Sequence, residues 1–340
     1  MEPSATRAED PAPLDFEPLT APVSPFEAHA ALRHFRAAGA VPIGYTAAGA
    51  RLARLLAALM LGMGLVCAGF FLLAAMAALL LAEFRAALFN AGVFAATLVG
   101  TAAGAWFALR RWKAVPAHWW RMGGFAQANG FGFAPAAAPP AAGLLFQAPA
   151  TGEVLDAFRV PLGTTTALVG NFCLRKWDMA GGTGRCRGFV AVPLAAGPPT
   201  AALLLPQGFP WPASERRPRR ENWSEAEWQP GVRDGPLLFF PPGKEAEART
   251  AFTAGLLAAI ADFPVPLAAE LNERWLLVHA HRSFDLDERR CWEPLWQFLH
   301  QAGRALGRIP GRDARWREIL GVGPAGNRIR LDIARDGDWQ

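Results

Sequence analysis

The feature that most constrains this chain is an apolar run from Leu55 to Leu109, interrupted only by Ala82-Glu83-Phe84-Arg85. A helix needs about 20 apolar residues to cross the hydrocarbon core of a bilayer. The segments on either side of the interruption, Leu55–Leu81 and Ala86–Leu109, contain no charged residue and are both long enough. Because lipid offers no hydrogen-bond partner to backbone amides, each segment must be helical. The run therefore predicts a transmembrane hairpin of two antiparallel helices over residues 55–109.

Basic residues around the run predict its orientation. Glu83 and Arg85 balance each other in the turn, whereas both flanks are basic: Arg33, Arg36, Arg51 and Arg54 precede the first helix, and Arg110, Arg111, Lys113 and Arg121 follow the second. The positive-inside rule then places both termini in the cytoplasm of a multi-pass protein of the cell (inner) membrane. We attribute the net charge of +5 to contact with anionic lipid, so no nucleic-acid partner is expected.

Small and aromatic residues predict how the hairpin makes contacts. Ala96, Gly100 and Gly104 form a ridge at four-residue spacing, which lets another helix approach closely. The ridge is compatible either with packing inside the hairpin or with a homodimer. The tryptophans Trp112, Trp119 and Trp120 follow the second helix, where an aromatic belt contacts the bilayer interface. Neither span holds an ionisable residue, which argues against a transport pathway.

The segments around the hairpin are predicted to differ in order. Residues 1–24 are rich in proline and acidic residues and are predicted to be a disordered tail. Residues 25–54 form an amphipathic lead-in, with a helix at 25–38 that lies on the bilayer surface or is solvated. Residues 110–142 are predicted to be an interfacial helix, at 118–129, followed by a linker rich in proline and alanine.

Residues 143–308 are predicted to be a cytoplasmic α+β domain, followed by a C-terminal tail at 309–340. Strand-like runs come first, at 144–147, 154–162, 164–177, 185–194, 201–205 and 237–240. A helix at 245–263, a strand at 274–282 and a helix at 287–306 come later. Strands followed by helices favour an antiparallel sheet with two packed helices over a doubly wound fold.

The long loop at 207–233 carries the most distinctive patch of the soluble part. It combines tryptophan with arginine at Trp211, Arg216, Arg217, Arg219 and Arg220, and Trp223 and Trp228 follow. Such a patch is compatible with contact to lipid headgroups or to a protein partner. Nearby glutamates almost cancel the charge, which favours a solvated loop over either contact.

No catalytic, cofactor-binding or metal-binding set is predicted. His279 and His281 alternate on a strand and share one face, and with Cys173 and Cys186 they contain ligand types for zinc, although no spacing requires it. Cys173 with His279 is also conceivable as a nucleophile and base at the membrane surface. A disulfide between Cys173 and Cys186 is not expected in a reducing cytoplasm. The glycine motif at 321–326 lacks the strand and helix of a dinucleotide site.

The order of these segments resembles a known group of proteins. A membrane hairpin is followed by the Trp119-to-Phe133 segment, a run of strands, an apolar helix, the strand from Glu273 to Val278 and a closing helix. This layout, over Arg51 to Gly307, resembles the uncharacterised membrane-anchored proteins of actinobacteria with a cytoplasmic domain of unknown function. The resemblance implies a membrane location and no particular activity. The leading hypothesis is a non-enzymatic binding or scaffold module; the alternatives are a membrane-surface enzyme and a domain that contacts lipid headgroups.

Overall fold

The computed structural model describes residues 12–42, 45–81, 83–140, 143, 146, 152–162, 165–174, 186–194, 200–206, 209, 223–228, 235–272 and 275–305. The chain divides into two compact units: residues 23–120 form one, and residues 121–340 together with 1–22 form the other. The first is helical, and the second is a mixed α+β unit built on an antiparallel sheet.

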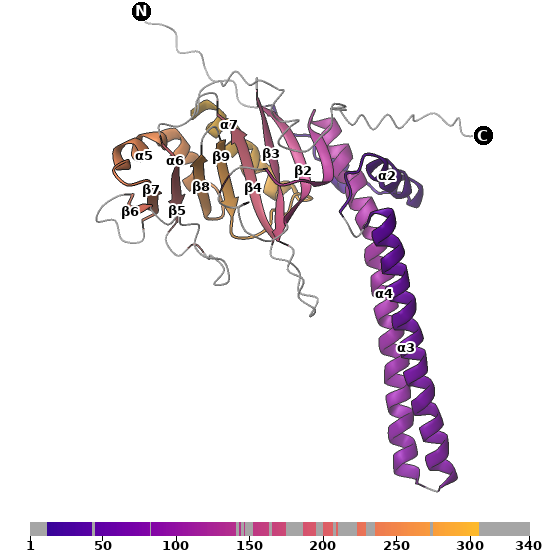
Figure 1. Ribbon diagram of the computed structural model, residues 1–340. Helices are drawn as coiled ribbons and strands as arrows, with labels where there is room; N and C mark the ends of the chain where they lie inside the picture. The colour runs from indigo at the N-terminus through magenta and orange to yellow at the C-terminus, as the bar shows by residue number, and fades with distance from the viewer. Residues whose placement is uncertain are drawn as a thin grey trace, which may run out of the picture. The chain divides into compact units, whose positions relative to one another are not determined.

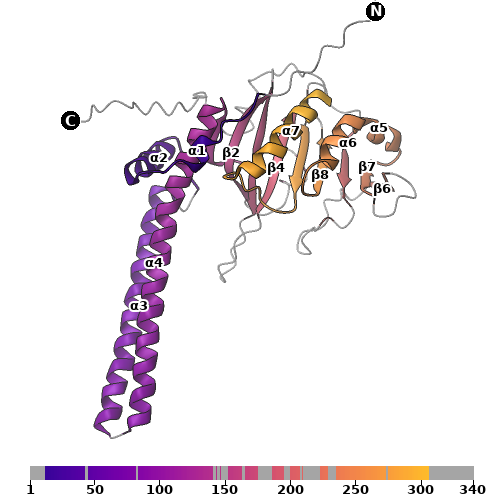
Figure 2. The same cartoon turned by 180° about the vertical axis from the view of Figure 1, so that it is seen from behind.

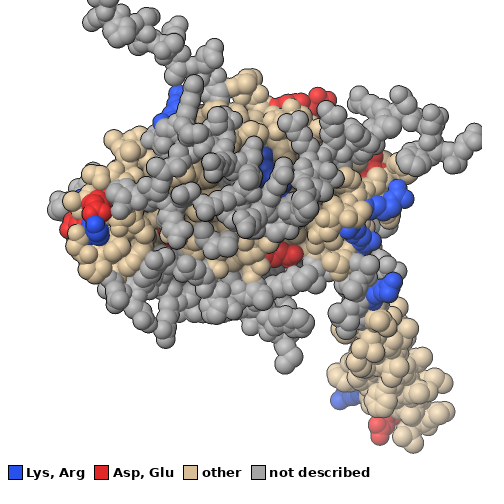
Figure 3. Space-filling view, turned by 45° about the horizontal axis from the view of Figure 1, so that its top comes forward, with Lys and Arg blue, Asp and Glu red and all other residues tan. Residues whose placement is uncertain are grey.

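The helical unit contains two long apolar helices, α3 (Ala47–Leu80) and α4 (Phe84–Ala128), which run side by side (Figures 1 and 2). Within them, Ala58–Leu80 and Phe84–Trp106 are each 23 residues long and apolar enough to cross a membrane. Large apolar side chains are exposed along both, including Phe70 at 68% and Val99 at 69%. In the view of Figure 3 the pair is uncharged except near its ends. Two apolar helices suited to spanning a membrane are therefore present.

Helix α4 differs from the sequence expectation. A separate interfacial helix at 118–129 was predicted, but α4 is one helix of 45 residues that continues through Pro116, and its residues from Arg121 onward belong to the α+β unit. The predicted contact inside the hairpin also lies elsewhere. A Cβ atom added at Gly64 would come within 2.6 Å of Thr101 Oγ1, whereas one added at Gly100 or Gly104 would meet nothing within 4 Å. The ridge is thus not the surface that joins α3 to α4, and homodimerisation through it stays a prediction.

Helix α2 (Pro25–Ala37) begins with a capping box. The Glu27 amide donates to Ser24 Oγ (3.2 Å) and the Ser24 amide donates to Glu27 Oε2 (2.7 Å). Its apolar face is covered, because Phe35 is buried and lies 6.4 Å from the Trp119 ring, which also contacts Tyr45. Leu32 and Phe35 are therefore covered by protein, and contact of this helix with the bilayer stays a prediction. Trp119, only 3% exposed, is a packing residue and not part of a lipid-facing belt.

The second unit is built on a sheet of nine described strands in the order β1-β2-β3-β4-β9-β8-β5-β7-β6, with every pair antiparallel. The strands are β1 (Gly132–Ala137), β2 (Gly152–Leu162), β3 (Thr165–Leu174), β4 (Cys186–Pro193), β5 (Ala202–Leu205), β6 (Ser224–Glu227), β7 (Leu237–Phe240), β8 (Leu267–Asn272) and β9 (Trp275–Ala280). Proline in β1 and exposed glutamates at Glu225 and Glu227 in β6 protect the two edges against further strand pairing.

Several strands were not expected. β1 lies in the predicted linker, and neither β6 nor β8 was identified as a strand. The predicted helix at 245–263 is two helices, α5 (Glu245–Ala251) and α6 (Ala254–Ala261), because Thr253 caps a new helix by accepting a hydrogen bond from the Leu256 amide (3.3 Å). The predicted β3–β4 hairpin is confirmed.

Helices α6 and α7 (Arg289–Ala305) lie over one face of the sheet (Figure 2). α7 buries a stripe at helical spacing: Trp292, Leu295, Phe298, Leu299 and Ala302. The Trp292 ring packs on Phe125 and Phe158 at 4.9 and 4.8 Å between centroids. The opposite face of the sheet carries two further apolar clusters, one around Phe172 and Phe189 and one around Leu203 and Phe239. Helix α7 thus buries one of its sides in the core, and its outer side forms a surface.

Candidate functional site

The outer side of α7 carries a groove of about 690 Å³. Its lining comes from α7 and from a stretch of the N-terminal segment: Pro13, Leu14, Phe16, Arg289, Glu293, Trp296, Gln297, His300, Gln301 and Arg304. A second, smaller hollow of about 420 Å³ shares Gln301 and Arg304 and reaches Gly255, Ala258 and Asp262 of the α6 region. Together they make the outer surface of α7 and α6 the candidate binding surface of the α+β unit.

An N-terminal strap, residues 12–20, forms one wall of this groove. Asp15 and Asn129 hold it reciprocally, with the Asp15 amide donating to Asn129 Oδ1 (2.8 Å) and Asn129 Nδ2 donating to the Asp15 carbonyl (2.9 Å). Phe16 stacks on Phe125 at 5.7 Å, and a short helix, α1 (Glu17–Thr20), follows. The prediction of a disordered tail at 1–24 is therefore wrong for residues 12–24, because its few apolar residues find a site on the folded unit.

The strap binds α7 as an extended peptide would. Trp296 Nε1 donates to the Ala12 carbonyl (3.1 Å), and the Arg289 guanidinium lies 5.1 Å from the Phe16 ring. Phe16 therefore lies near the start of α7 and Ala12 near its middle. The rest of the groove continues along α7 to Arg304.

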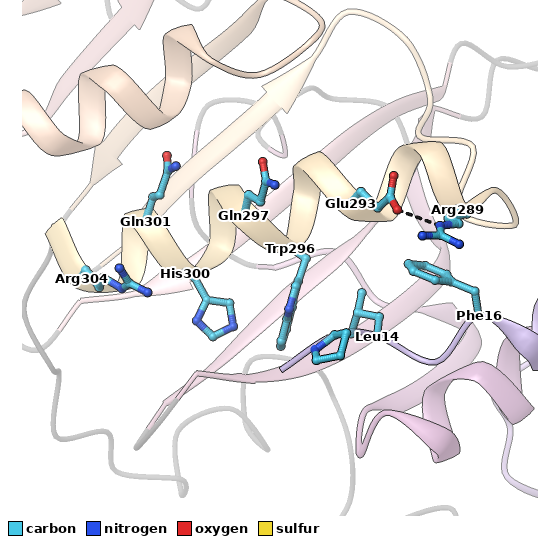
Figure 4. Close-up of a pocket in the computed structure, with 10 residues that line it drawn as sticks. Leu14, Phe16, Arg289, Glu293, Trp296, Gln297, His300, Gln301 and Arg304 are labelled. Atoms are coloured by element: carbon cyan, nitrogen blue, oxygen red, sulfur yellow. Dashed lines mark hydrogen bonds and ion pairs between the residues drawn. The ribbon is translucent and has the colours of Figure 1, made fainter. Parts of the chain in front are cut away.

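The lining side chains project from α7 in two directions (Figure 4). Trp296 and His300 point to the side where Leu14 lies, with their rings 4.3 Å apart, while Gln297 and Gln301 point to the other side. Arg289 Nε donates to Glu293 Oε1 (2.7 Å), which ties up the groove's carboxylate. The polar groups do not converge on one point as a catalytic set must. They suit an elongated ligand better than a small one.

The charged side chains that line the groove are two arginines and one glutamate. Arg289 is paired with Glu293, and Arg304 lines the groove beside His300. Burial, and secondarily the positive charge of Arg304, lowers the pKa of His300. The Nε2 atom of His300 is buried and has no hydrogen-bond partner among the described residues. His300 is therefore expected to act as a neutral imidazole at neutral pH.

The structure separates the residues of the hypothetical nucleophile and base. Cys173 is bonded to Cys186, so it offers no thiolate, and the expectation that this disulfide is absent is wrong. Successive residues of a strand point to opposite faces, so Cys173 and Phe172 lie on different faces of the sheet. His279 is paired with Phe189, and Phe189 lies on the same face as Phe172. Cys173 and His279 thus point to opposite faces of the sheet. Among the described residues no group of three potential metal ligands exists.

His279 and His281 do share one side, as predicted, since both contact Phe209, at 5.7 and 6.3 Å between centroids. His279 is only 1% exposed, and burial together with the charge of Arg187 lowers its pKa to about 3. A histidine with so low a pKa is a weak base at neutral pH. Its role is structural, as part of the core between the sheet and Phe209.

The depressed pKa of His279 predicts a pH dependence of stability. The unfolded histidine titrates near 6.5 and the folded one near 3, so between these values the unfolded chain binds the extra proton. The contribution of His279 to the free energy of unfolding is therefore fully present above pH 6.5. It is lost as the pH falls, with a slope that approaches about 1.4 kcal/mol per pH unit. We expect the His279→Gln variant to lose this slope between pH 4 and 6.5 in urea titrations. The His29→Gln variant, changed at an exposed position of α2, should retain it. An unchanged slope in His279→Gln would contradict the assignment.

The remaining predicted contact residues have different fates. Trp211, Arg216, Arg217, Arg219 and Arg220 lie outside the described residues, as does the side chain of Trp112. Trp120 is half-buried. Trp223 packs in the core with Leu203 and Phe239, and Trp228 lies against Phe252 and the Arg249 guanidinium. These last two tryptophans stabilise the fold and are not free for lipid.

Sequence reasoning missed the groove residues Trp296, His300 and Arg304. Their spacing of four residues places them on one side of a helix, which was a usable signal. This signal is easily overlooked, because the apolar side of the same helix already accounts for the segment as part of the core. The contribution of the strap depends on a contact more than 100 residues away in the chain, for which the sequence has no signal.

Comparisons with known proteins add little. No family model and no curated protein matches the chain. Among solved structures, the crystal structure of the mycobacterial trehalose monomycolate transport factor A, TtfA, aligns at 12% identity and a TM-score of 0.37, covering 56% of this chain and 95% of that one. A likeness of this degree carries no argument about what this chain binds.

Proposed function

We propose that this protein is a membrane-anchored, non-enzymatic binding module whose α+β unit lies on the cytoplasmic side. In this proposal α3 and α4 span the membrane as a hairpin and contact the lipid bilayer, and the outer surface of α7 binds an extended peptide segment of a partner protein. Kinship with the actinobacterial membrane-anchored proteins is part of the same proposal.

The observation that carries the peptide proposal is the strap. An extended segment of the chain itself already binds in the α7 groove. Its Ala12 carbonyl accepts a hydrogen bond from the Trp296 indole, and its Phe16 ring lies against the Arg289 guanidinium. Exposed Gln297 and Gln301 offer amide groups that can donate to and accept from a second peptide backbone. Because the strap lies along α7 as an extended segment, the partner segment is expected to be extended as well.

Site-specific photo-crosslinking in cells tests the binding surface. A photoreactive residue at Gln301 should give a discrete protein adduct, and the same residue at Glu225, equally exposed on β6, should give none. Adding Arg304→Glu should reduce the Gln301 adduct at least several-fold, because the substitution reverses the charge of the surface. Adducts of equal strength from Gln301 and Glu225 would contradict a specific α7 surface.

Orientation needs its own measurement. Single cysteines placed at residues 26 and 225, in a chain from which all four native cysteines have been removed, should resist a membrane-impermeant thiol reagent in intact cells and react after permeabilisation. A cysteine at Glu83, between the two apolar helices, should react in intact cells. Labelling of residue 225 in intact cells would place the α+β unit outside and overturn the cytoplasmic assignment.

The alternative functions have less support. The membrane-surface enzyme relied on Cys173, His279 and His281. Cys173 and His279 point to opposite faces of the sheet, and His279 is buried with a low pKa. Of the aromatic residues in the 207–233 loop, Trp223 is in the core and Trp228 packs against Phe252 and the Arg249 guanidinium, which weakens the case for lipid-headgroup contact. The rest of that patch lies outside the described residues.

A further inference from the structure

A pair of cysteines lies where strands β3 and β4 approach their connection. Cys173 and Cys186 are directly opposite each other in the register, with Cα atoms 4.1 Å apart, and their sulfur atoms are bonded. Both residues are half-buried, so a small reagent can reach them.

The other two cysteines do not share these properties. Cys67 lies within the apolar part of α3. Burial, followed by the negative charge of Asp285, raises the pKa of the Cys291 thiol to about 11, which keeps it protonated and unreactive at neutral pH. Redox chemistry in this chain is thus expected to concentrate on the cross-strand pair.

The strands that the pair joins also hold the segment leading into α7. Asn171, two residues from Cys173, accepts a hydrogen bond from the Phe284 amide (2.7 Å) and donates to its carbonyl (3.0 Å). The Gly188 amide, two residues from Cys186, donates to the Arg282 carbonyl (2.8 Å). A Cβ atom at position 188 would lie 2.3 Å from the Phe284 ring, so only glycine permits this packing. The covalent link therefore fixes the two strand positions that hold the β9–α7 connection.

We propose that Cys173 and Cys186 form a reversible thiol–disulfide site that fixes the β9–α7 connection, and with it the start of the groove helix, when oxidised. This inference rests on the cytoplasmic placement proposed above, because disulfides that form in that compartment are usually transient and responsive to oxidants.

The reaction is an exchange with a low-molecular-weight disulfide. One cysteine thiolate attacks the reagent, forms a mixed disulfide and releases one thiolate. The second cysteine thiolate then attacks the mixed disulfide, forms the Cys173–Cys186 bond and releases the second thiolate. The pair loses two electrons and two protons, and the reagent is reduced to two thiols.

Thiol trapping of the full chain in its native membrane tests the proposal. In a Cys67→Ser, Cys291→Ser background, only the pair can take up a mass-tagged alkylating reagent after acid quenching. We expect two tags per chain in resting cells, none after brief exposure to the membrane-permeant disulfide 4,4′-dithiodipyridine, and two again after recovery. A pair that stays reduced under this disulfide would overturn the inference.

A pair that is always oxidised would also overturn the inference. The orientation labelling then shows whether the cytoplasmic placement fails with it. If residue 225 is shielded in intact cells while the pair is always oxidised, the bond is purely structural and only this inference fails. If residue 225 is exposed, the cytoplasmic placement fails as well. Reduction of the oxidised chain supplies a second readout: hydrogen exchange at residues 282–288 should accelerate several-fold in the wild-type chain and remain unchanged in the Cys173→Ser, Cys186→Ser variant.

Discussion

Replacing Trp292 by alanine is expected to lower the free energy of unfolding of the α+β unit by about 3–5 kcal/mol. The indole is fully buried and touches Phe125, Phe131 and Phe158, which reach it from three different parts of the chain. Its Nε1 atom also donates to the Leu286 carbonyl (2.7 Å), which would be left without that donor. Because domains are stable by only about 5–15 kcal/mol, this loss takes a large part of the total.

Pulse proteolysis of the full chain in detergent and urea measures this effect as a shift of the unfolding midpoint. Trp296→Ala is the matched control, since it removes the same side chain one turn further along α7 from a half-buried position. We expect it to cost about 1 kcal/mol, the value of its hydrogen bond to the strap. Equal destabilisation by both variants would show that the core does not centre on Trp292.

The sequence predicts α7 as a helix, because apolar residues recur at the helical spacing whatever the partner surface is. It also identifies most strands and the two apolar helices, since length and absence of charge need no tertiary information. The β3–β4 hairpin is also predictable, because two strand-like runs flank a glycine-rich stretch of sequence.

What the sequence could not predict depends on contacts between distant segments. The strap was predicted to be disordered because its own composition offers little to bury, and only Phe125 and Asn129 give it a site. Strand β1 contains proline and small residues and is recognisable only as an edge strand beside β2. The disulfide was rejected on compartment, although the facing positions of Cys173 and Cys186 in the hairpin make the bond geometrically accessible.

The same limit applies to function. A groove is a property of surfaces brought together from α7, α6 and the strap, and each contributes residues that are ordinary by themselves. Histidine and cysteine, the residue types most suggestive of chemistry, are placed by the fold on opposite faces of the sheet or in a disulfide. The groove side of α7 carries two amides and one imidazole, and the proposed recognition of a polypeptide rests on these groups and on the strap.

Introducing a charge on the apolar helices should produce the second large effect. Phe70 lies near the middle of the 58–80 segment and is 68% exposed. If α3 spans a bilayer, Phe70→Arg places a guanidinium in hydrocarbon, at a cost of about 2.5–3.5 kcal/mol, whereas in water the change would cost almost nothing. We expect a marked loss of the protein fraction that resists alkaline extraction from membranes.

Phe26 provides the matched control because it is the same residue type at nearly the same exposure, 65%, on α2. In an aqueous environment Phe26→Arg and Phe70→Arg would behave alike, so only a membrane around α3 predicts a difference between them. Phe26→Arg should leave extraction unchanged, because α2 buries Leu32 and Phe35 rather than Phe26. Indistinguishable extraction of the two variants would mean that the exposed apolar surface of α3 is covered by protein, and the hairpin would then be an oligomer interface instead of an anchor.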